Sequence, residues 1–156
     1  KEIHYQMNDK NYYGIGFKND SDGYEIRNKY SKICLGKKDI STIKNSSENL
    51  KIFEGFFDFL SFKNVEEFLQ KEPADYLILN SVSMISKIKK SLDNYENIEL
   101  YFDNDEAGNR AVKMLKNELE NIEDCRVLYS DLKDLNEYLT QQTNEVHQQY
   151  KPRFKR

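Results

Sequence analysis

The 156-residue sequence predicts an α/β domain preceded by a small antiparallel part. From residue 50 onward, short apolar runs alternate with segments whose apolar residues recur at helical spacing, which is the pattern of a parallel sheet with connecting helices. Before residue 45, short alternating runs are separated by turn-forming residues such as those at 19–23, which is typical of antiparallel strands. The length suits one ordinary core with some appended structure.

The α/β part contains four predicted strands with helices between them. The helix after the first strand places Phe59, Phe62, Phe68 and Leu69 on roughly one side. The helix after the third strand spaces its apolar residues as a buried stripe, namely Ala107, Ala111, Met114, Leu115 and Leu119. The strands are predicted at residues 50–54, 76–80, 98–103 and 126–130.

A polar stretch at residues 44–49 separates the two parts and marks the expected domain boundary. We therefore expect a small N-terminal subdomain over residues 1–47 and a core over residues 48–140. Residues 141–156 are rich in glutamine and then in basic residues, so we expect a frayed polar tail there.

The charge distribution indicates an acidic centre with basic flanks. Residues 52–150 carry 20 acidic and 10 basic side chains, whereas the last six residues carry four basic side chains and no acidic one. Such an arrangement suits carboxylates that divalent cations neutralise, with nearby lysines and arginines that hold a polyanion. The alternative is that each charged run is an ordinary solvated face.

The two cysteines, Cys34 and Cys125, are too few for a disulfide framework and too far apart for a paired zinc site. No apolar run has the length of a signal sequence or membrane span, so we expect a reduced, cytoplasmic protein. The sequence starts at Lys1 without methionine and ends in a basic hexapeptide, so we expect it to be a piece of a longer protein.

Acidic and polar residues follow the predicted strands. Ligands bind at the carboxyl ends of strands in an open parallel sheet, so these residues are the candidates for function. Clustered carboxylates repel one another unless a cation compensates them, and Mg²⁺ or Mn²⁺ prefers a few carboxylates together with water and phosphate oxygens. The candidate metal ligands are Glu54, Asp58, Asp103, Asp105 and Asp134, and Ser81 and Ser83 are candidates for phosphate contact.

Two features of the Asp103-Asn104-Asp105 segment support this interpretation. Side chains at positions i and i+2 share a face, so both aspartates point the same way. Gly108 removes a side chain where a phosphate could approach the backbone amides at the start of a helix. The alternative is that Asp105 caps the helix and Glu54 is a surface acid.

Other motifs fail. Asp103, Asp105 and Gly108 match an EF-hand at its first, third and sixth positions, but Met114 stands where the bidentate glutamate should be. Gly14 and Gly16 lack the third glycine of a dinucleotide fingerprint, and no phosphate-loop motif exists. The sequence therefore does not favour an ATPase or helicase.

The segments Ile52-Phe53-Glu54-Gly55-Phe56-Phe57-Asp58 and Leu100-Tyr101-Phe102-Asp103-Asn104-Asp105-Glu106-Ala107-Gly108 together resemble the Toprim signature of primases, topoisomerases and some nucleases. The resemblance is best with primases, and it covers about residues 50–140. The segment Lys133-Asp134-Leu135-Asn136-Glu137 is similar to the third acidic element of that family, although Asn136 stands where primases often have a second acid. Residues 11–43 also resemble, less sharply, the segment before the core in primase-like proteins of mobile elements.

The resemblance implies a Rossmann-like, four-stranded parallel sheet between helices and the synthesis of RNA primers on single-stranded DNA. It implies Mg²⁺ or Mn²⁺ as cofactor, nucleoside triphosphates as substrates, and a replicative helicase as partner. Glu54, Asp103 and Asp105 would be the catalytic residues, with Glu54 as a metal ligand or as the proton acceptor. Further candidates for phosphate or nucleic-acid contact are Gly55, Gly108, Arg27, Lys37 and Lys38.

Two other functions remain open. A Toprim nuclease would cut DNA with the same metal cluster, and a non-catalytic module would use the fold to bind DNA or a partner. A topoisomerase is disfavoured because nothing marks one of the 11 tyrosines as a nucleophile.

Overall fold

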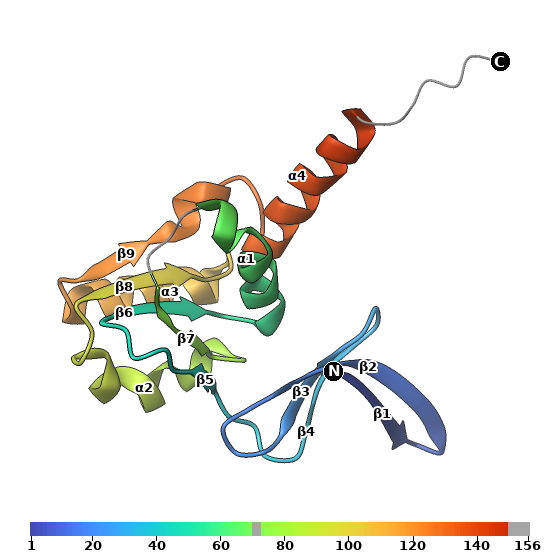
Figure 1. Ribbon diagram of the computed structural model, residues 1–156. Helices are drawn as coiled ribbons and strands as arrows, with labels where there is room; N and C mark the ends of the chain where they lie inside the picture. The colour runs from blue at the N-terminus through green and yellow to red at the C-terminus, as the bar shows by residue number, and fades with distance from the viewer. Residues whose placement is uncertain (70–72, 150–156) are drawn as a thin grey trace.

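The computed structural model describes residues 1–69 and 73–149, which form two sheets (Figure 1). The first sheet is antiparallel, in the order β1-β2-β3-β4. Its strands are β1 (Glu2–Met7), β2 (Lys10–Lys18), β3 (Tyr24–Arg27) and β4 (Lys32–Leu35). The predicted antiparallel part is thereby confirmed.

The second sheet has five strands in the order β5-β7-β6-β8-β9. The last four strands in this order pair in parallel, as predicted, and β5 adds an antiparallel edge strand that the sequence analysis did not predict. The strands are β5 (Ser41–Ile43), β6 (Asn49–Phe53), β7 (Asp75–Ile78), β8 (Asn97–Tyr101) and β9 (Ile122–Asp124).

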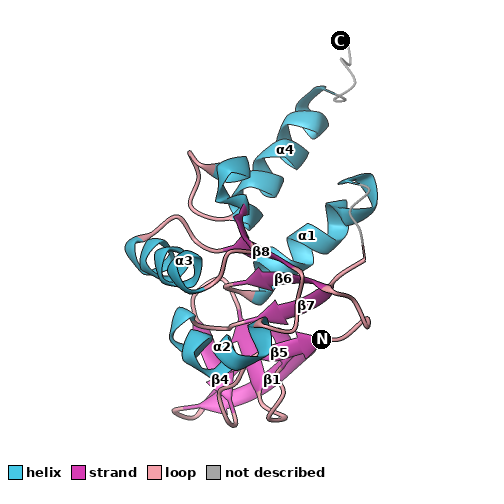
Figure 2. Ribbon diagram, turned by 90° about the vertical axis from the view of Figure 1, so that its left-hand side faces the viewer, coloured by secondary structure: helices cyan, strands magenta, loops and turns pink. Residues whose placement is uncertain are grey.

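Helices cover both faces of the second sheet (Figure 2). One core cluster joins the sheet to α2 (Ile85–Leu92) and α3 (Glu106–Glu118). A second, more aromatic cluster joins the other face to α1 (Phe56–Leu69) and α4 (Leu135–Gln149). The predicted sheet between helices is therefore confirmed, because apolar residues on both faces of each central strand are buried.

The central strand β6 buries one charged side chain. The Lys51 side chain is 2% exposed, and its Nζ atom lies 3.1 Å from Glu99 Oε1 on the neighbouring strand β8. Residues 51 and 99 are direct partners in the parallel register of the two strands. Glu99 also accepts a hydrogen bond from the Tyr101 hydroxyl. Removing only one charge of a buried pair of this kind is strongly destabilising.

The strand predicted at residues 126–130 is wrong. The chain forms a 3₁₀ helix there, η2 (Cys125–Tyr129), and strand β9 lies just before it. The buried residues Cys125 and Tyr129 are four positions apart, while Val127 is 78% exposed, so burial follows a helical rather than an alternating period. The Asp124 side chain starts this turn by accepting a hydrogen bond from the Arg126 backbone amide at 3.2 Å.

The frayed tail expected from residue 141 is also wrong as far as residue 149, because α4 continues to Gln149. Glutamine and glutamate are good helix formers, which explains why a polar sequence remains helical here. The basic residues 151–156 lie outside the described residues. Among the helices that the structure describes, none has both the length and the apolar character needed to cross a membrane.

Contacts around the β2–β3 turn join the first sheet to the second. Asp20 accepts two hydrogen bonds from Thr42 of β5, from its backbone amide at 2.9 Å and from its hydroxyl at 2.7 Å. The Ser41 hydroxyl donates to the Lys18 carbonyl at 3.0 Å. Phe17 stacks on Phe56 of α1 with ring centroids 5.5 Å apart. These contacts position β3 and β4 beside the carboxyl end of the second sheet.

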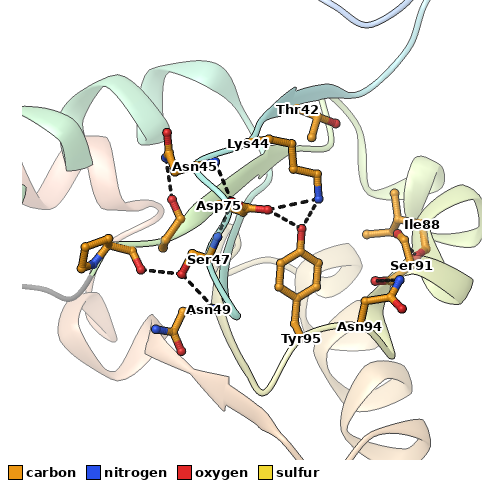
Figure 3. Close-up of polar contacts among 12 residues, drawn as sticks. Thr42, Lys44, Asn45, Ser47, Asn49, Asp75, Ile88, Ser91, Asn94 and Tyr95 are labelled. Carbon is orange, nitrogen blue, oxygen red and sulfur yellow. Dashed lines mark hydrogen bonds and ion pairs between the residues drawn. The ribbon is translucent and has the colours of Figure 1, made fainter.

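Residues 44–49, which the sequence suggests as a domain boundary, form an ordered turn around Asp75 (Figure 3). The Asp75 carboxylate accepts hydrogen bonds from the backbone amides of Asn45 (2.7 Å) and Ser47 (3.3 Å) and from the Tyr95 hydroxyl (2.8 Å). Lys44 lies 3.1 Å away as a counter-charge. Burial opposes ionisation, but these hydrogen bonds prevail and lower the pKa of Asp75 to about 2.

Candidate active site

A pocket of about 310 Å³ lies where β6 and β8 end, between the second sheet and the first. Glu54 follows directly after β6, and Asp103 comes two residues after β8. The pocket combines four carboxylates with basic and amide side chains. Its lining residues are Arg27, Asn28, Lys32, Glu54, Gly55, Phe57, Asp58, Asp103, Lys133, Asp134 and Asn136.

Glu54 and Asp103 are adjacent because their strands are neighbours in parallel register. The Asp103 backbone amide donates a hydrogen bond to Glu54 Oε2 at 3.3 Å. Burial and then the negative charge of Asp103 raise the pKa of Glu54 to about 7, although the Asp103 amide and Lys32 oppose this shift. The Glu54 carboxylate therefore changes charge near neutral pH, which is a common property of groups in active sites.

Asp58 and Asp134 extend the acidic cluster from α1 to the start of α4. Asp58 is 7% exposed, and burial and then the charge of Asp134 raise its pKa to about 7. Asp58 accepts a hydrogen bond from the Asn136 amide at 3.1 Å. Asp134 accepts one from the Glu137 amide at 2.8 Å, while Glu137 accepts one from the Lys133 amide at 2.9 Å, so a reciprocal cap fixes this turn.

Three basic residues face these carboxylates. The Lys133 Nζ atom lies 3.9 Å from both Asp103 Oδ2 and Asp134 Oδ2. Arg27 is half-buried, and its burial lowers its pKa, against the attraction of Asp58 and Asp103. Burial and then the charge of Arg27 likewise lower the pKa of Lys32. Within the described part of the chain, the Arg27 guanidinium makes no ion pair or hydrogen bond, so it is available to a ligand.

Asp105 has a structural role whether or not it also binds a metal. Its Oδ1 atom accepts a hydrogen bond from the Gly108 amide at 2.8 Å and caps α3. The pocket lining does not include it, although its charge contributes to the raised pKa of Glu54. Gly108 is required because a Cβ atom there would lie 2.1 Å from the Asp103 carbonyl oxygen. Close packing of α3 against this turn therefore accounts for the glycine, and the contact of this turn with a phosphate stays a prediction.

Substitutions at Asp105 separate capping from metal binding. We expect Asp105→Ala to lower the free energy of unfolding by about 1 kcal/mol, because the Gly108 amide loses its acceptor. Asp105→Asn should keep the stability of the parent, because asparagine caps helices equally well. Urea unfolding measures both effects. If Asp105→Asn is as unstable as Asp105→Ala, the negative charge of Asp105 has a role beyond its capping hydrogen bond. Calorimetric titration with Mn²⁺ then shows whether that role is metal binding.

The remaining predicted residues fall into two groups. Arg27 and Gly55 lie at the pocket, where a Cβ atom on Gly55 would be 3.7 Å from the Arg27 Nη2 atom. Four others do not line it, although they remain candidates for phosphate contact. The Ser81 and Ser83 hydroxyls lie 3.0 Å apart beyond β7, and Ser83 lines a separate depression against α3; Lys37 and Lys38 are exposed after β4.

Several polar residues in the pocket or beside it could not be assigned from the sequence. Lys32 could not be assigned because its position depends on the β3–β4 register, which places it opposite Arg27. Asn104 donates hydrogen bonds to the carbonyls of Tyr129 and Leu132, both at 2.8 Å, and so holds the segment before α4 against β8. Lys133 and Asn136 lie in the segment that resembles the third acidic element, but that resemblance points only to its acidic residues as site residues.

The carboxylate oxygens are suitable ligands for Mg²⁺ or Mn²⁺. In the described part of the chain, no group of three or more His, Cys, Asp or Glu side chains is close enough to form a preformed metal cage. Mg²⁺ does not need such a cage, because it commonly uses one or two carboxylates with waters and substrate phosphates. Burial and then the charge of Asp134 also raise the pKa of Asp103, so three carboxylates of this pocket favour a compensating cation.

The pKa of Asp58 leads to a prediction for the metal-free protein. Between the ordinary value of 3.8 and about 7, folded Asp58 retains a proton that the unfolded chain has released, so stability falls as pH rises through this range. With chelator at pH 8, Asp58→Asn should be more stable than the parent by about 2 kcal/mol. Urea unfolding should show this difference shrinking toward zero by pH 4. A difference that does not change with pH would contradict the buried-charge explanation.

Sequence and structure comparisons agree with this geometry. A family profile described as Toprim-like matches residues 51–139, and one described as a domain of unknown function (DUF8464) matches residues 1–36. No curated protein matches the sequence.

Two solved structures share the fold. The primase fragment of the bacteriophage T7 primase-helicase protein is 21% identical with a TM-score of 0.57, and the match covers 95% of this chain and 65% of that one. Primase domains of gp4 subunits in a bacteriophage T7 lagging-strand DNA polymerase complex, bound to an RNA/DNA hybrid and dTTP, provide a second match. It has 19% identity and a TM-score of 0.57, and it covers 94% of this chain and 80% of that one. Because the family profile spans more than half of the sequence, the chain belongs to the Toprim-like family.

Proposed function

We propose that the chain is the core of a primase-type nucleotidyltransferase that joins ribonucleotides on a single-stranded DNA template. The observation that carries this proposal is the pair Glu54 and Asp103 at the ends of two adjacent parallel strands, with Arg27, Lys32 and Lys133 around them. Carboxylates that hold a metal, next to cations that hold phosphates, are the parts that phosphoryl transfer requires. The shared fold with primase domains bound to an RNA/DNA hybrid and dTTP supports the same substrate class.

Each group in the pocket has a distinct task in this proposal. Glu54 and Asp103 would hold Mg²⁺ or Mn²⁺, which when bound stabilises negative charge on the triphosphate and lowers the pKa of the attacking hydroxyl. Arg27 and Lys32 contact the phosphates of the nucleotide or the template. A Glu54 carboxylate with a pKa of about 7 can also accept the proton of that hydroxyl. Both roles of Glu54 require its ionised form.

Extension of a pre-annealed primer tests this function directly. The chain is incubated with an RNA primer on a DNA template, the four ribonucleoside triphosphates and Mn²⁺, and both strands are resolved on a denaturing gel. Lengthened RNA is expected. A pre-annealed primer removes the step of positioning two free nucleotides, which is costly without further contacts to the template.

Other products of the same reaction would assign a different function. Shortened DNA without longer RNA would indicate a Toprim nuclease. Unchanged strands, with DNA binding retained, would leave a nucleic-acid-binding module. If extension is observed, a replicative helicase becomes the natural partner to test, since one structural relative is the primase fragment of a primase-helicase protein.

A further inference from the structure

A second groove, of about 440 Å³, lies on the first sheet next to the carboxylate pocket. Arg27, Asn28 and Phe57 line both hollows, so the two are continuous. The groove is more apolar than the pocket, and most of its other residues come from β2 and the β3–β4 turn. They include Tyr12, Tyr13, Gly14, Ile15, Lys29 and Tyr30.

Strand register places the apolar and basic residues of this groove on one face of the first sheet. Ile15 pairs with Arg27, and Arg27 pairs with Lys32, so these three side chains project to the same side. Tyr13, two positions from Ile15 on β2, shares that side. Phe17 continues the same row into the core, where it stacks on α1. One face therefore leads from exposed aromatic residues to the two cations at the carboxylates.

The large apolar residues of this face are unusually exposed. Tyr13 is 65% exposed, Ile15 47% and Tyr30 87%. His4 stacks against Tyr13 with ring centroids 6.0 Å apart, and Lys29 Nζ lies 5.6 Å from the centre of the Tyr30 ring. A contiguous exposed apolar surface of this kind usually marks a binding site.

Asn28 organises the two tyrosines. Its side-chain oxygen accepts hydrogen bonds from the backbone amides of Tyr30 and Ser31, both at 2.9 Å. Its side-chain nitrogen donates to the Tyr13 carbonyl at 3.2 Å. One side chain thus fixes the turn that carries Tyr30 to the strand that carries Tyr13, which lowers the entropic cost of binding a ligand between them.

We propose that this aromatic face (Tyr13, Ile15 and Tyr30) stacks the unpaired bases of single-stranded nucleic acid, whose phosphates contact Lys29, Lys32 and Arg27. Exposed rings beside a line of cations provide both features that single-strand binding uses, base stacking and neutralisation of the backbone. The groove opens into the carboxylate pocket, so the bound strand leads to that pocket. This inference deepens the proposed function, since the strand would be its template, and it assigns a role to the region that matches a domain of unknown function.

Binding without metal or nucleotides separates this inference from the proposed function. The affinity of the chain for a fluorescently labelled 12-residue oligothymidylate is measured by anisotropy in chelator. The double variant Tyr13→Ala/Tyr30→Ala should bind on the order of 10- to 100-fold more weakly, whereas Tyr13→Phe/Tyr30→Phe should bind within about twofold of the parent. The control is Met7→Ala, which removes an apolar side chain that is 46% exposed on the opposite face of the same sheet.

Salt dependence distinguishes stacking from charge. The slope of log affinity against log salt should stay unchanged in the double alanine variant, which removes no charge. The magnitude of the slope should decrease by about 1.4 in Lys29→Ala/Lys32→Ala, because each lost contact to a single strand removes about 0.7. Circular dichroism confirms that each variant is folded.

Intrinsic fluorescence gives an independent readout. The chain has no tryptophan and 11 tyrosines, so its emission reports tyrosine alone. Stacking with bases should quench part of this emission in the parent protein, and the phenylalanine double variant should lose that quenching while it retains affinity. A duplex of the same length should bind more weakly, because its bases are not free to stack.

Three results would overturn the inference. These are an unchanged affinity in the double alanine variant, an equal loss in the alanine and phenylalanine variants, and equal binding of duplex and single strand. Ring-dependent binding without any primer extension would refute the proposed function and leave this inference standing. Primer extension with ring-independent binding would support the proposed function and refute this inference.

Discussion

Glu54→Gln is expected to reduce the rate of primer extension by on the order of 10²- to 10⁴-fold. Glutamine preserves the size of the side chain and the acceptor for the Asp103 amide, but it cannot supply the charge for a metal or accept a proton. Single-turnover extension measured with saturating Mn²⁺ and template gives this rate. Asp93→Asn is the matched control, because Asp93 is an exposed acid that follows α2.

The pH profile supplies a second measure of the same carboxylate. Since Glu54 has a pKa of about 7, the parent rate measured at limiting metal should rise between pH 6 and pH 8 as the side chain ionises. Glu54→Gln should lose that rise. A variant that extends primers within a few-fold of the parent, or that keeps the parent's pH profile, would contradict both proposed roles of Glu54.

Lys51→Met should destabilise the folded chain by about 3 kcal/mol, because it removes the buried cation that lies 3.1 Å from Glu99 Oε1 inside the sheet. The free energy of unfolding from urea titration measures this loss. Adding Glu99→Gln to Lys51→Met should recover most of the lost free energy of unfolding. A neutral amide needs no counter-charge, and it can still accept the hydrogen bond from the Tyr101 hydroxyl. If the loss in the double variant equals the sum of the losses in Lys51→Met and Glu99→Gln, the two residues do not interact energetically.

The parallel strands and the proximity of Glu54 to Asp103 could be predicted from the sequence because both follow from short-range patterns. Each central strand is a short apolar run that is buried on both faces, and Glu54 follows β6 directly while Asp103 comes two residues after β8. Strand ends converge in any open parallel sheet, so the neighbourhood of these two acids did not depend on details of packing. Arg27 was predicted only as a candidate for phosphate contact, and the structure places it beside Gly55.

Features that depend on long-range pairing could not be predicted in this way. The basic residue Lys32 reaches the pocket only through the register of β4 on β3. The segment at 125–129 has the composition of a strand, but the hydrogen bonds that Asp124 accepts from Arg126 and the burial of Tyr129 make it a helical turn. The cap formed by Asp105 was an explicit alternative, and no sequence pattern distinguishes a capping aspartate from one that also binds a metal.

The edges of the second sheet have a consequence for self-association. Both edge strands, β5 (Ser41–Ile43) and β9 (Ile122–Asp124), contain three residues. Such short edges offer few backbone groups to a strand from another molecule, and short edge strands are one of the ways in which proteins avoid aggregation. In the first sheet, by contrast, the edge strand β1 (Glu2–Met7) contains six residues. If concentrated protein forms intermolecular sheet, we therefore expect hydrogen-exchange protection to increase first along β1 and not along β5 or β9.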